Sequence, residues 1–391
     1  MDAEKYSKRG VSASKSEIHE AIEKMDKGLF PKAFCKILPD ITGGDDAFVN
    51  IMHADTAGTK TSLAYIYWKE TGDLSVWEGI VQDALVMNLD DMACVGCTDQ
   101  IIISSTIGRN KHLIPKEVLE VILNASASFI QKMKALGINI YHSGGETADV
   151  GDIVRTIDVG FTAFARMRRE DLVVNNIKPG DAIIGFASFG QAGYEDQYNG
   201  GMGSNGLTSA RHDVFSKIYQ NKYPESFDPK TDKTFIYSGT KKLTDKIDTG
   251  SVEIEAGKLV LSPTRTYLPL LNKILRFHRK NIHGIIHNTG GAQTKVLKFV
   301  ENCTIIKDNL FPVPPLFRLI QNESGTDWNE MYKVFNMGHR LEIYIEPQFG
   351  KELLQIASEM NIESRIIGRV EKGVGNRLDR KSTRLNSSHL V

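Results

Sequence analysis

Three acidic positions in the first 150 residues each lie at the end of an apolar segment, beside small residues. They are Asp55 in the segment His53–Lys60, Asp91 at the end of a helical pattern, and Glu146 after two glycines. Glycines let a ligand approach the backbone, and carboxylates beside a lysine suit Mg²⁺ and a nucleoside triphosphate. Like charges that are brought together need a compensating cation. The pattern therefore predicts that three carboxylates converge on one Mg²⁺ ion in an enzyme that uses ATP.

Alternating strands and helices must position these carboxylates. Residues 48–54 are typical of a strand that delivers Asp55, and apolar residues at helical spacing predict a helix that ends at Asp90–Asp91. Further elements are expected as a strand at 101–108, a helix at 115–137, and a strand that runs into a glycine-rich loop at 144–147. A helix capped at Ser14 or Ser16 is expected before them.

The second half begins after a polar stretch that contains Lys178-Pro179-Gly180, where a fresh apolar strand follows. We therefore predict an α/β (α+β) protein with domains at 1–176 and 177–378. Within the second domain we expect helices at 207–219, 265–279 and 294–301, and strands at 282–287 and 340–346. Residues 379–391 resemble translated vector sequence and are left out of the fold prediction.

Charge and composition exclude several classes of protein. Lys plus Arg equals Asp plus Glu at 48 each, so no net field attracts nucleic acid or an anionic membrane. The four cysteines are too few for a disulfide framework and are interpreted as reduced packing thiols. The N-terminus is polar, and no apolar window approaches the length of about 20 residues needed to span a bilayer. We expect a soluble cytoplasmic protein.

Two glycine-containing segments resemble nucleotide-binding motifs without matching them. Gly58-Thr59-Lys60-Thr61 lacks the contiguous Gly-Lys-Ser/Thr of a P-loop. Gly201–Gly206 has the G-x-G-x-x-G spacing, but polar residues precede it where a dinucleotide fold needs a strand. The second segment opens a helix, so it either binds an anion or caps that helix.

His283 and His287 lie four residues apart, but Gly284 stands where a zinc protease has its glutamate. His287 is either a structural histidine or a site residue. The glycines at 290 and 291 favour a site, because they let a phosphate approach the backbone after a strand.

Several longer motifs resemble one family. They are Glu330–Gly338 (EMYKVFNMG), Pro314–Arg318, Gly144–Ala148, Ser204–Gly206, Pro263–Tyr267 and Asp55–Lys60. Together they resemble aminoimidazole ribonucleotide (AIR) synthetase, also called phosphoribosylformylglycinamidine cyclo-ligase, of the PurM family. The matches keep the family's order along the chain from about residue 6 to residue 370. The resemblance implies a PurM-like two-domain fold and a homodimer with a central β-barrel built from both N-terminal domains.

The resemblance also implies a reaction in de novo purine synthesis. Formylglycinamidine ribonucleotide and ATP would give aminoimidazole ribonucleotide, ADP and phosphate. ATP would phosphorylate the formyl oxygen, and the amidine nitrogen would attack that carbon as phosphate leaves. Such chemistry needs charge neutralisation and alignment more than a protein nucleophile.

Roles carried over from the family fall on the matching positions. The expected catalytic residues are Asp55, Lys60, Asp91 and His287. The expected ATP and phosphate contacts are Gly58, Thr59, Lys60, Gly144, Gly145, Thr147, Thr289, Gly290 and Gly291. The expected substrate contacts are Ser204, Asn205 and Gly206, and the expected Mg²⁺ ligands are Asp55, Asp91 and Glu146. The polar N-terminal segment is expected to close over ATP, because the reaction needs water excluded.

The sequence also departs from the family pattern, which indicates a divergent branch. The departures are Thr56 for glycine, Asp90 for asparagine, Gly203 for histidine, Asn288 for isoleucine, His339-Arg340 for small or apolar residues, Pro31–Cys35 for a glycine-rich loop, and an insertion at 191–200.

Other enzymes of the same superfamily remain rivals. Phe335–Gly338 argues against thiamine-monophosphate kinase and selenophosphate synthetase, and Cys35 is a poor candidate for the reactive residue of the latter. The chain has no glutaminase motif, which argues against the formylglycinamide ribonucleotide amidotransferase. A non-catalytic nucleotide-binding relative is the rival from another class, and the retained carboxylates disfavour it.

Overall fold

The computed structural model describes residues 4–11, 21 and 24–379 of the chain. The helix expected from Ser14 or Ser16 lies outside these residues, as does the tail from residue 380 onward. A short helix, α1 (Glu4–Ser7), is the first described element.

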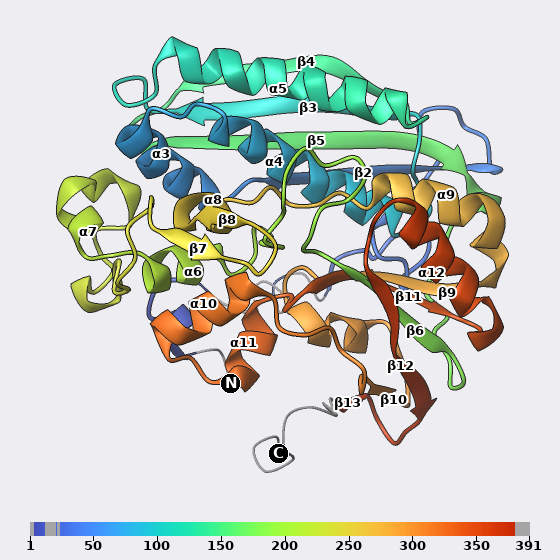
Figure 1. The fold of residues 1–391 in the computed structure, drawn as a ribbon. Coiled ribbons are helices and arrows are strands. Elements are labelled where there is room, and N and C mark those ends of the chain that lie inside the picture. The colour runs from blue at the N-terminus through green and yellow to red at the C-terminus, as the bar shows by residue number, and fades with distance from the viewer. Residues whose placement is uncertain (1–3, 12–20, 22–23, 380–391) are drawn as a thin grey trace.

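The first half of the chain forms a five-stranded sheet. Its order is β1 (Ile37–Pro39), β2 (Phe48–Thr56), β5 (Ile157–Arg168), β3 (Ile101–Arg109) and β4 (Ile140–Asp149), with β3 and β4 parallel and the other neighbours antiparallel. Three helices lie along one face of it (Figure 1), namely α3 (Lys60–Thr71), α4 (Val76–Ala93) and α5 (Lys116–Ala135). The predicted strand that leads to Asp55 and the predicted helix that carries Asp91 near its end are therefore confirmed.

The opposite face of this sheet is open in the single chain. Met52, Phe164, Ile102 and Tyr141 lie directly across from one another on four neighbouring strands. Met52 is 61% exposed and Tyr141 52% exposed. Such a row of apolar side chains in contact with water marks an interaction surface.

The expected glycine-rich loop at 144–147 is wrong, because β4 continues through it to Asp149. A Cβ added to Gly145 would lie 2.2 Å from the carbonyl oxygen of Ser105 on β3. Gly145 therefore serves the close approach of two strands at a register shift between Ile103 and Ser105.

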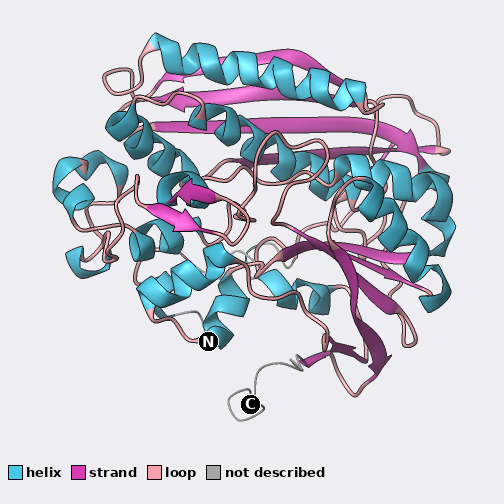
Figure 2. Cartoon of the chain, viewed as in Figure 1, coloured by secondary structure: helices cyan, strands magenta, loops and turns pink. Residues whose placement is uncertain are grey.

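The second half forms a six-stranded sheet. Its order is β13 (Arg377–Asp379), β10 (Cys303–Ile306), β12 (Ser364–Lys372), β6 (Ala182–Ala187), β11 (His339–Ile345) and β9 (Ile282–His287). A separate hairpin pairs β7 (Lys246–Asp248) with β8 (Glu253–Glu255). The helices are α6 (Leu207–Val214), α7 (Ile218–Lys222), α8 (Ala256–Val260), α9 (Leu268–His278), α10 (Pro315–Ser324), α11 (Trp328–Val334) and α12 (Gly350–Glu359). Figure 2 shows this mixture of helices and strands in both halves.

Short 3₁₀ turns connect these elements. They are η1 (Arg169–Asp171), η2 (Pro224–Ser226), η3 (Lys233–Phe235), η4 (Arg279–Asn281), η5 (Ala292–Lys298) and η6 (Pro347–Phe349). The α-helix expected at 294–301 is therefore a 3₁₀ helix. The helix expected at 207–219 is interrupted, because Phe215 and Ser216 become extended and form β-bridges to Lys241 and Gly239.

Buried apolar side chains from both halves form one large core cluster that includes the helices between the two sheets, and a second, smaller cluster contains Ile183, Ile286 and Tyr344 of the second sheet. All four cysteines are buried and free of disulfides, as expected for packing thiols. Burial raises the pKa of Cys94 well above its usual range. Within the described residues, no helix has both the length and the apolar character to cross a membrane.

Candidate active site between the two halves

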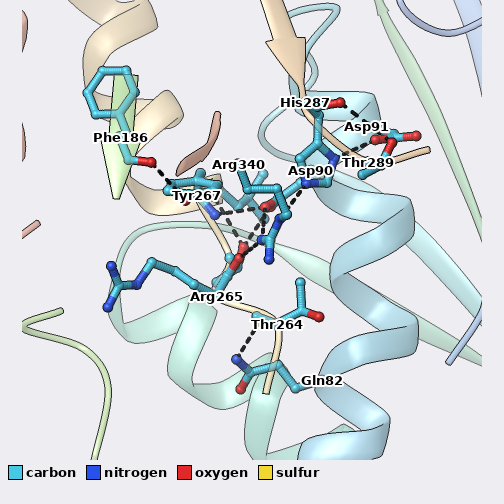
Figure 3. Close-up of polar contacts among 12 residues, drawn as sticks. Gln82, Asp90, Asp91, Phe186, Thr264, Arg265, Tyr267, His287, Thr289 and Arg340 are labelled. Carbon is cyan, nitrogen blue, oxygen red and sulfur yellow. Dashed lines mark hydrogen bonds and ion pairs between the residues drawn. The ribbon is translucent and has the colours of Figure 1, made fainter. Parts of the chain in front are cut away.

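An extended segment of the second half, Pro263–Tyr267, lies along α4 of the first half (Figure 3). Asp83 and Asp90 are seven residues apart, so they share one face of α4. The Asp83 carboxylate accepts the backbone N–H of Thr264 at 2.7 Å. The Asp90 carboxylate accepts the hydroxyl of Thr266 at 2.8 Å and the backbone N–H of Tyr267 at 2.9 Å. Two helix carboxylates therefore hold the halves together beside Asp91.

Lys60 belongs to this junction and does not face a phosphate site, which corrects its assignment as a catalytic and ATP-binding residue. Its Nζ lies 2.8 Å from Asp83 and donates to the carbonyl of Ser262 at 2.5 Å. The Lys60 side chain has no exposed area. Burial lowers the pKa of Lys60, although the charge of Asp83 opposes this shift. The ammonium group of Lys60 therefore forms a buried ion pair with Asp83.

Asp91, at the C-terminal end of α4, faces two histidines. Its Oδ1 lies 2.6 Å from Nδ1 of His287 on β9, and its Oδ2 lies 3.4 Å from Nε2 of His53 on β2. Burial alone would raise the pKa of Asp91, but the charge of Lys295 and the hydrogen bonds from both histidines hold it well below its usual range. Burial opposes protonation of His53, yet Asp91 outweighs it and raises the pKa of His53. The site therefore keeps an ionised carboxylate at the junction.

The hydrogen bonds of His287 fix its tautomer. Nε of Arg340, on β11, donates to Nε2 of His287 at 2.8 Å (Figure 3). Since Nε2 accepts, the ring proton resides on Nδ1 and is donated to Asp91. Burial lowers the pKa of His287 to about 4. Both ring nitrogens are occupied, so His287 positions Asp91 and Arg340 in this structure.

Loops from both halves also contact each other. The hydroxyl of Thr59, at the start of α3, lies 2.8 Å from the hydroxyl of Thr208 in α6. A Cβ added to Gly290 would lie 3.7 Å from the side-chain nitrogen Nδ2 of Asn205. The structure therefore places Thr59 against α6, and it places the loop that follows His287 beside Asn205.

The predicted metal centre is not assembled in the single chain. Side chains alternate along a strand, so Asp55 points to the helical face with His53, whereas Thr56 points to the open face. Glu146 lies in the same cross-strand row as Thr56, on the open face and three strands away, a distance of about 14 Å. Within the described residues, no group of three or more His, Cys, Asp or Glu side chains is arranged to hold a metal ion. The convergence expected of Asp55, Asp91 and Glu146 is therefore wrong for one chain.

The same geometry divides the expected phosphate contacts. Gly144, Gly145 and Thr147 lie in β4, at the edge of the sheet, together with Glu146. Gly58, Thr59 and the loop Thr289–Gly291 lie at the junction. The single chain does not bring the first group to the second.

Three residues of the site were not predicted. His53 could have been found, because it lies two positions before Asp55 and so shares its face. Lys295 follows the Gly290-Gly291 pair, and its Nζ donates to Thr289 at 2.5 Å and lies 4.4 Å from the centre of the Phe34 ring. Arg340 was recognised only as a departure from the family pattern, and nothing local in the sequence shows that it contacts His287.

The described part of the N-terminal segment packs on α6. The backbone N–H of Gly206 is a hydrogen-bond partner of the Tyr6 hydroxyl. The buried Arg9 pairs with Asp213 at 2.7 Å and donates to the hydroxyl of Ser209 at 3.0 Å. This segment therefore lies at the Ser204–Gly206 loop.

Comparisons with known proteins match this architecture. Residues 44–167 match the family "AIR synthase related protein, N-terminal domain". The phosphoribosylformylglycinamidine cyclo-ligase of Methanocaldococcus jannaschii is 27% identical over 350 residues, which are 87% of this chain and 85% of the relative. The enzyme of the same name from Pyrococcus furiosus is 28% identical, over 82% of this chain and 79% of the relative.

A solved structure shares the fold at low sequence identity. The structure described as AaThiL complexed with AMPPCP and TMP aligns with a TM-score of 0.51 and 12% identity, covering 95% of this chain and 93% of that one. The fold is therefore PurM-like, as predicted. Residues 44–167 therefore match the AIR synthase related family, and most of the chain is similar to these two cyclo-ligases.

Proposed function

We propose that the chain is an AIR synthetase: it closes formylglycinamidine ribonucleotide to aminoimidazole ribonucleotide with ATP, releasing ADP and phosphate. The similarity to cyclo-ligases over most of both chains is the observation that carries this proposal. The AIR synthase related domain at 44–167 supports it. The reaction would take place in the cytoplasm.

The junction between the halves is the proposed reaction site. It offers an ionised carboxylate at Asp91, glycine-flanked loops at 58–59 and 289–291, and the ammonium group of Lys295 beside Thr289. ATP would phosphorylate the formyl oxygen, and the amidine nitrogen would then attack the same carbon and expel phosphate. The protein would align the two substrates and balance the charge of the transferred phosphoryl group. Lys295 replaces Lys60 as the proposed phosphate contact.

ATP use is supported by the fold, since the related ThiL structure was solved with the ATP analogue AMPPCP. Mg²⁺ would arrive with the nucleotide, and Asp55 and Asp91 would be the carboxylates on the helical face of the sheet that meet it. The described residues do not form a preassembled ion site, so Glu146 is not included in this proposal.

We also propose a homodimer through the open face of the first sheet. The row Met52, Phe164, Ile102 and Tyr141 exposes apolar area that a second copy of the same sheet would cover. Two such sheets that face each other across this row would bury it.

An acceptor panel tests the proposed reaction. The purified chain is incubated with ATP, Mg²⁺ and, separately, formylglycinamidine ribonucleotide, thiamine monophosphate or selenide, and ADP and each product are quantified. ADP and aminoimidazole ribonucleotide are expected in equal amounts with the first acceptor only. ADP release with thiamine monophosphate or selenide would identify a rival superfamily reaction. Nucleotide binding without turnover on any acceptor would identify a non-catalytic relative.

A further inference from the structure

Arg340 has two of its three nitrogens fixed by protein groups. Nε donates to His287 at 2.8 Å, and Nη2 donates to the backbone carbonyl of Arg265 and lies 3.7 Å from the Asp90 carboxylate. The Tyr267 ring lies under the guanidinium at 5.4 Å. These contacts hold the guanidinium in one orientation at the junction.

The third nitrogen, Nη1, is buried and has no hydrogen-bond partner among the described residues. Arg340 is 2% exposed. A buried N–H without a partner is energetically unfavourable, so native structures rarely keep one without a reason. The position of Nη1 indicates where a partner would lie.

Nη1 lies near the loop before α6. A Cβ added to Gly203 would lie 3.6 Å from Cδ and 3.8 Å from Nη1 of Arg340. The next side chain, Ser204, also has a buried hydroxyl without a partner among the described residues. A fixed cationic donor therefore lies near Gly203, and the residue after this glycine carries a buried hydroxyl without a partner among the described residues.

We propose that Arg340 Nη1 and the Ser204 hydroxyl bind an oxygen of a phosphate group beside Gly203. This inference rests on the proposed function, because the two substrates of that reaction both carry phosphate. Guanidinium and hydroxyl donors are the groups that recognise phosphate oxygens. The same arginine donates to His287, which in turn contacts Asp91. A phosphate bound to Nη1 would therefore be linked through Arg340 and His287 to Asp91.

Two substitutions test this without removing a hydrogen bond within the protein. Ser204→Ala deletes only the free hydroxyl. Gly203→Val adds methyl groups where a ligand of Nη1 would lie, while Gly203→Ala is the matched control, because a Cβ alone meets Arg340 at ordinary contact distance. Calorimetry measures the dissociation constants of each variant for ribose 5-phosphate and for AMPPCP.

We expect Ser204→Ala and Gly203→Val to weaken binding of one probe about tenfold or more, with Gly203→Ala close to wild type. Loss confined to ribose 5-phosphate assigns the pocket to the substrate phosphate, and loss confined to AMPPCP assigns it to the nucleotide. Wild-type binding of both probes by both variants, or failure of the wild type to bind either probe, would overturn the inference. Ring closure in the acceptor panel is measured separately, so either proposal can fail alone.

Discussion

The His287 ring is shared between the two halves: its Nδ1 faces Asp91 at 2.6 Å, and its Nε2 accepts from Arg340 at 2.8 Å. The bond that Nε2 accepts requires the neutral ring, and burial lowers the pKa of His287 to about 4 in the folded chain. An unfolded histidine titrates near pH 6.5. Between these values the unfolded state binds a proton that the folded His287 does not bind, so stability falls as the pH falls.

We therefore predict that His287→Gln removes part of the pH dependence of folding. Between pH 7.5 and pH 5 the wild type should lose roughly 2 kcal/mol more of its free energy of unfolding than the variant loses. Urea unfolding at both pH values measures this difference, and other titrating groups cancel between the two proteins. An equal loss of unfolding free energy in the wild type and the variant would show that His287 does not cause this part of the pH dependence.

Lys60 and Asp83 form a fully buried ion pair, and this makes a second prediction at the scale of the residue. Lys60→Met leaves Asp83 buried without its cation, so the free energy of unfolding should fall by about 3–5 kcal/mol. Lys258→Met is the control, because its pair with Asp73 is partly exposed and should contribute less than about 1 kcal/mol. A Lys60→Met protein of normal stability with a raised KM for ATP would instead restore Lys60 to the phosphate site.

These residues also show what the sequence could predict. The strand before Asp55 and the helix that ends at Asp91 follow from periodicity, which is a local property of the chain. The burial of Lys60 depends on Ser262, which lies 202 positions away, and the tautomer of His287 depends on Arg340, 53 positions away. Spacing along the sequence does not predict contacts between residues so far apart. The sequence therefore identifies Lys60 and His287 as site candidates but does not predict their roles.

At the scale of the element, β4 explains the failure of the three-carboxylate prediction. Paired glycines favoured a loop, and a loop would have left Glu146 free to approach Asp55. The strand instead continues, and its register shift against β3 pairs Glu146 with Thr106, on the open face. The sequence located the acidic residue correctly, but it could not show the face on which it lies.

The role of Gly145 in this strand can be tested. Gly145→Ala would place a methyl group 2.2 Å from a backbone oxygen of β3, so β4 must shift or detach. We expect a loss of at least about 2 kcal/mol in the free energy of unfolding, which is typical of forced backbone displacement. Thr147→Ala, two positions along the same exposed strand, should change stability by less than about 0.5 kcal/mol. Equal stability of the two variants would contradict the close packing of β3 and β4.

At the scale of the whole molecule, the open sheet face and the junction are two separate features. The junction joins the halves of one chain through Asp83, Asp90 and Asp91, whereas the open face exposes Met52, Ile102 and Tyr141 to water. A second copy is the occupant that we propose for the open face.

Ile102→Lys should therefore yield a monomer, because it places a charge at the centre of the apolar row. Sedimentation equilibrium of the wild type should give twice the mass of this variant. Phe277→Lys is the control, because Phe277 is 69% exposed on α9 and lies outside the row. A wild type that sediments as a monomer, or an Ile102→Lys protein that remains a dimer, would exclude this face as the interface.

The central claim is that the chain transfers the γ-phosphoryl group of ATP to the formyl oxygen of its substrate before the ring closes. The direct measurement uses formylglycinamidine ribonucleotide labelled with ¹⁸O in the formyl group, with detection of the label by mass spectrometry of the released phosphate. We predict one labelled oxygen in each phosphate, together with equal amounts of ADP and aminoimidazole ribonucleotide. Unlabelled phosphate, or ADP formed without the imidazole product, would contradict the claim.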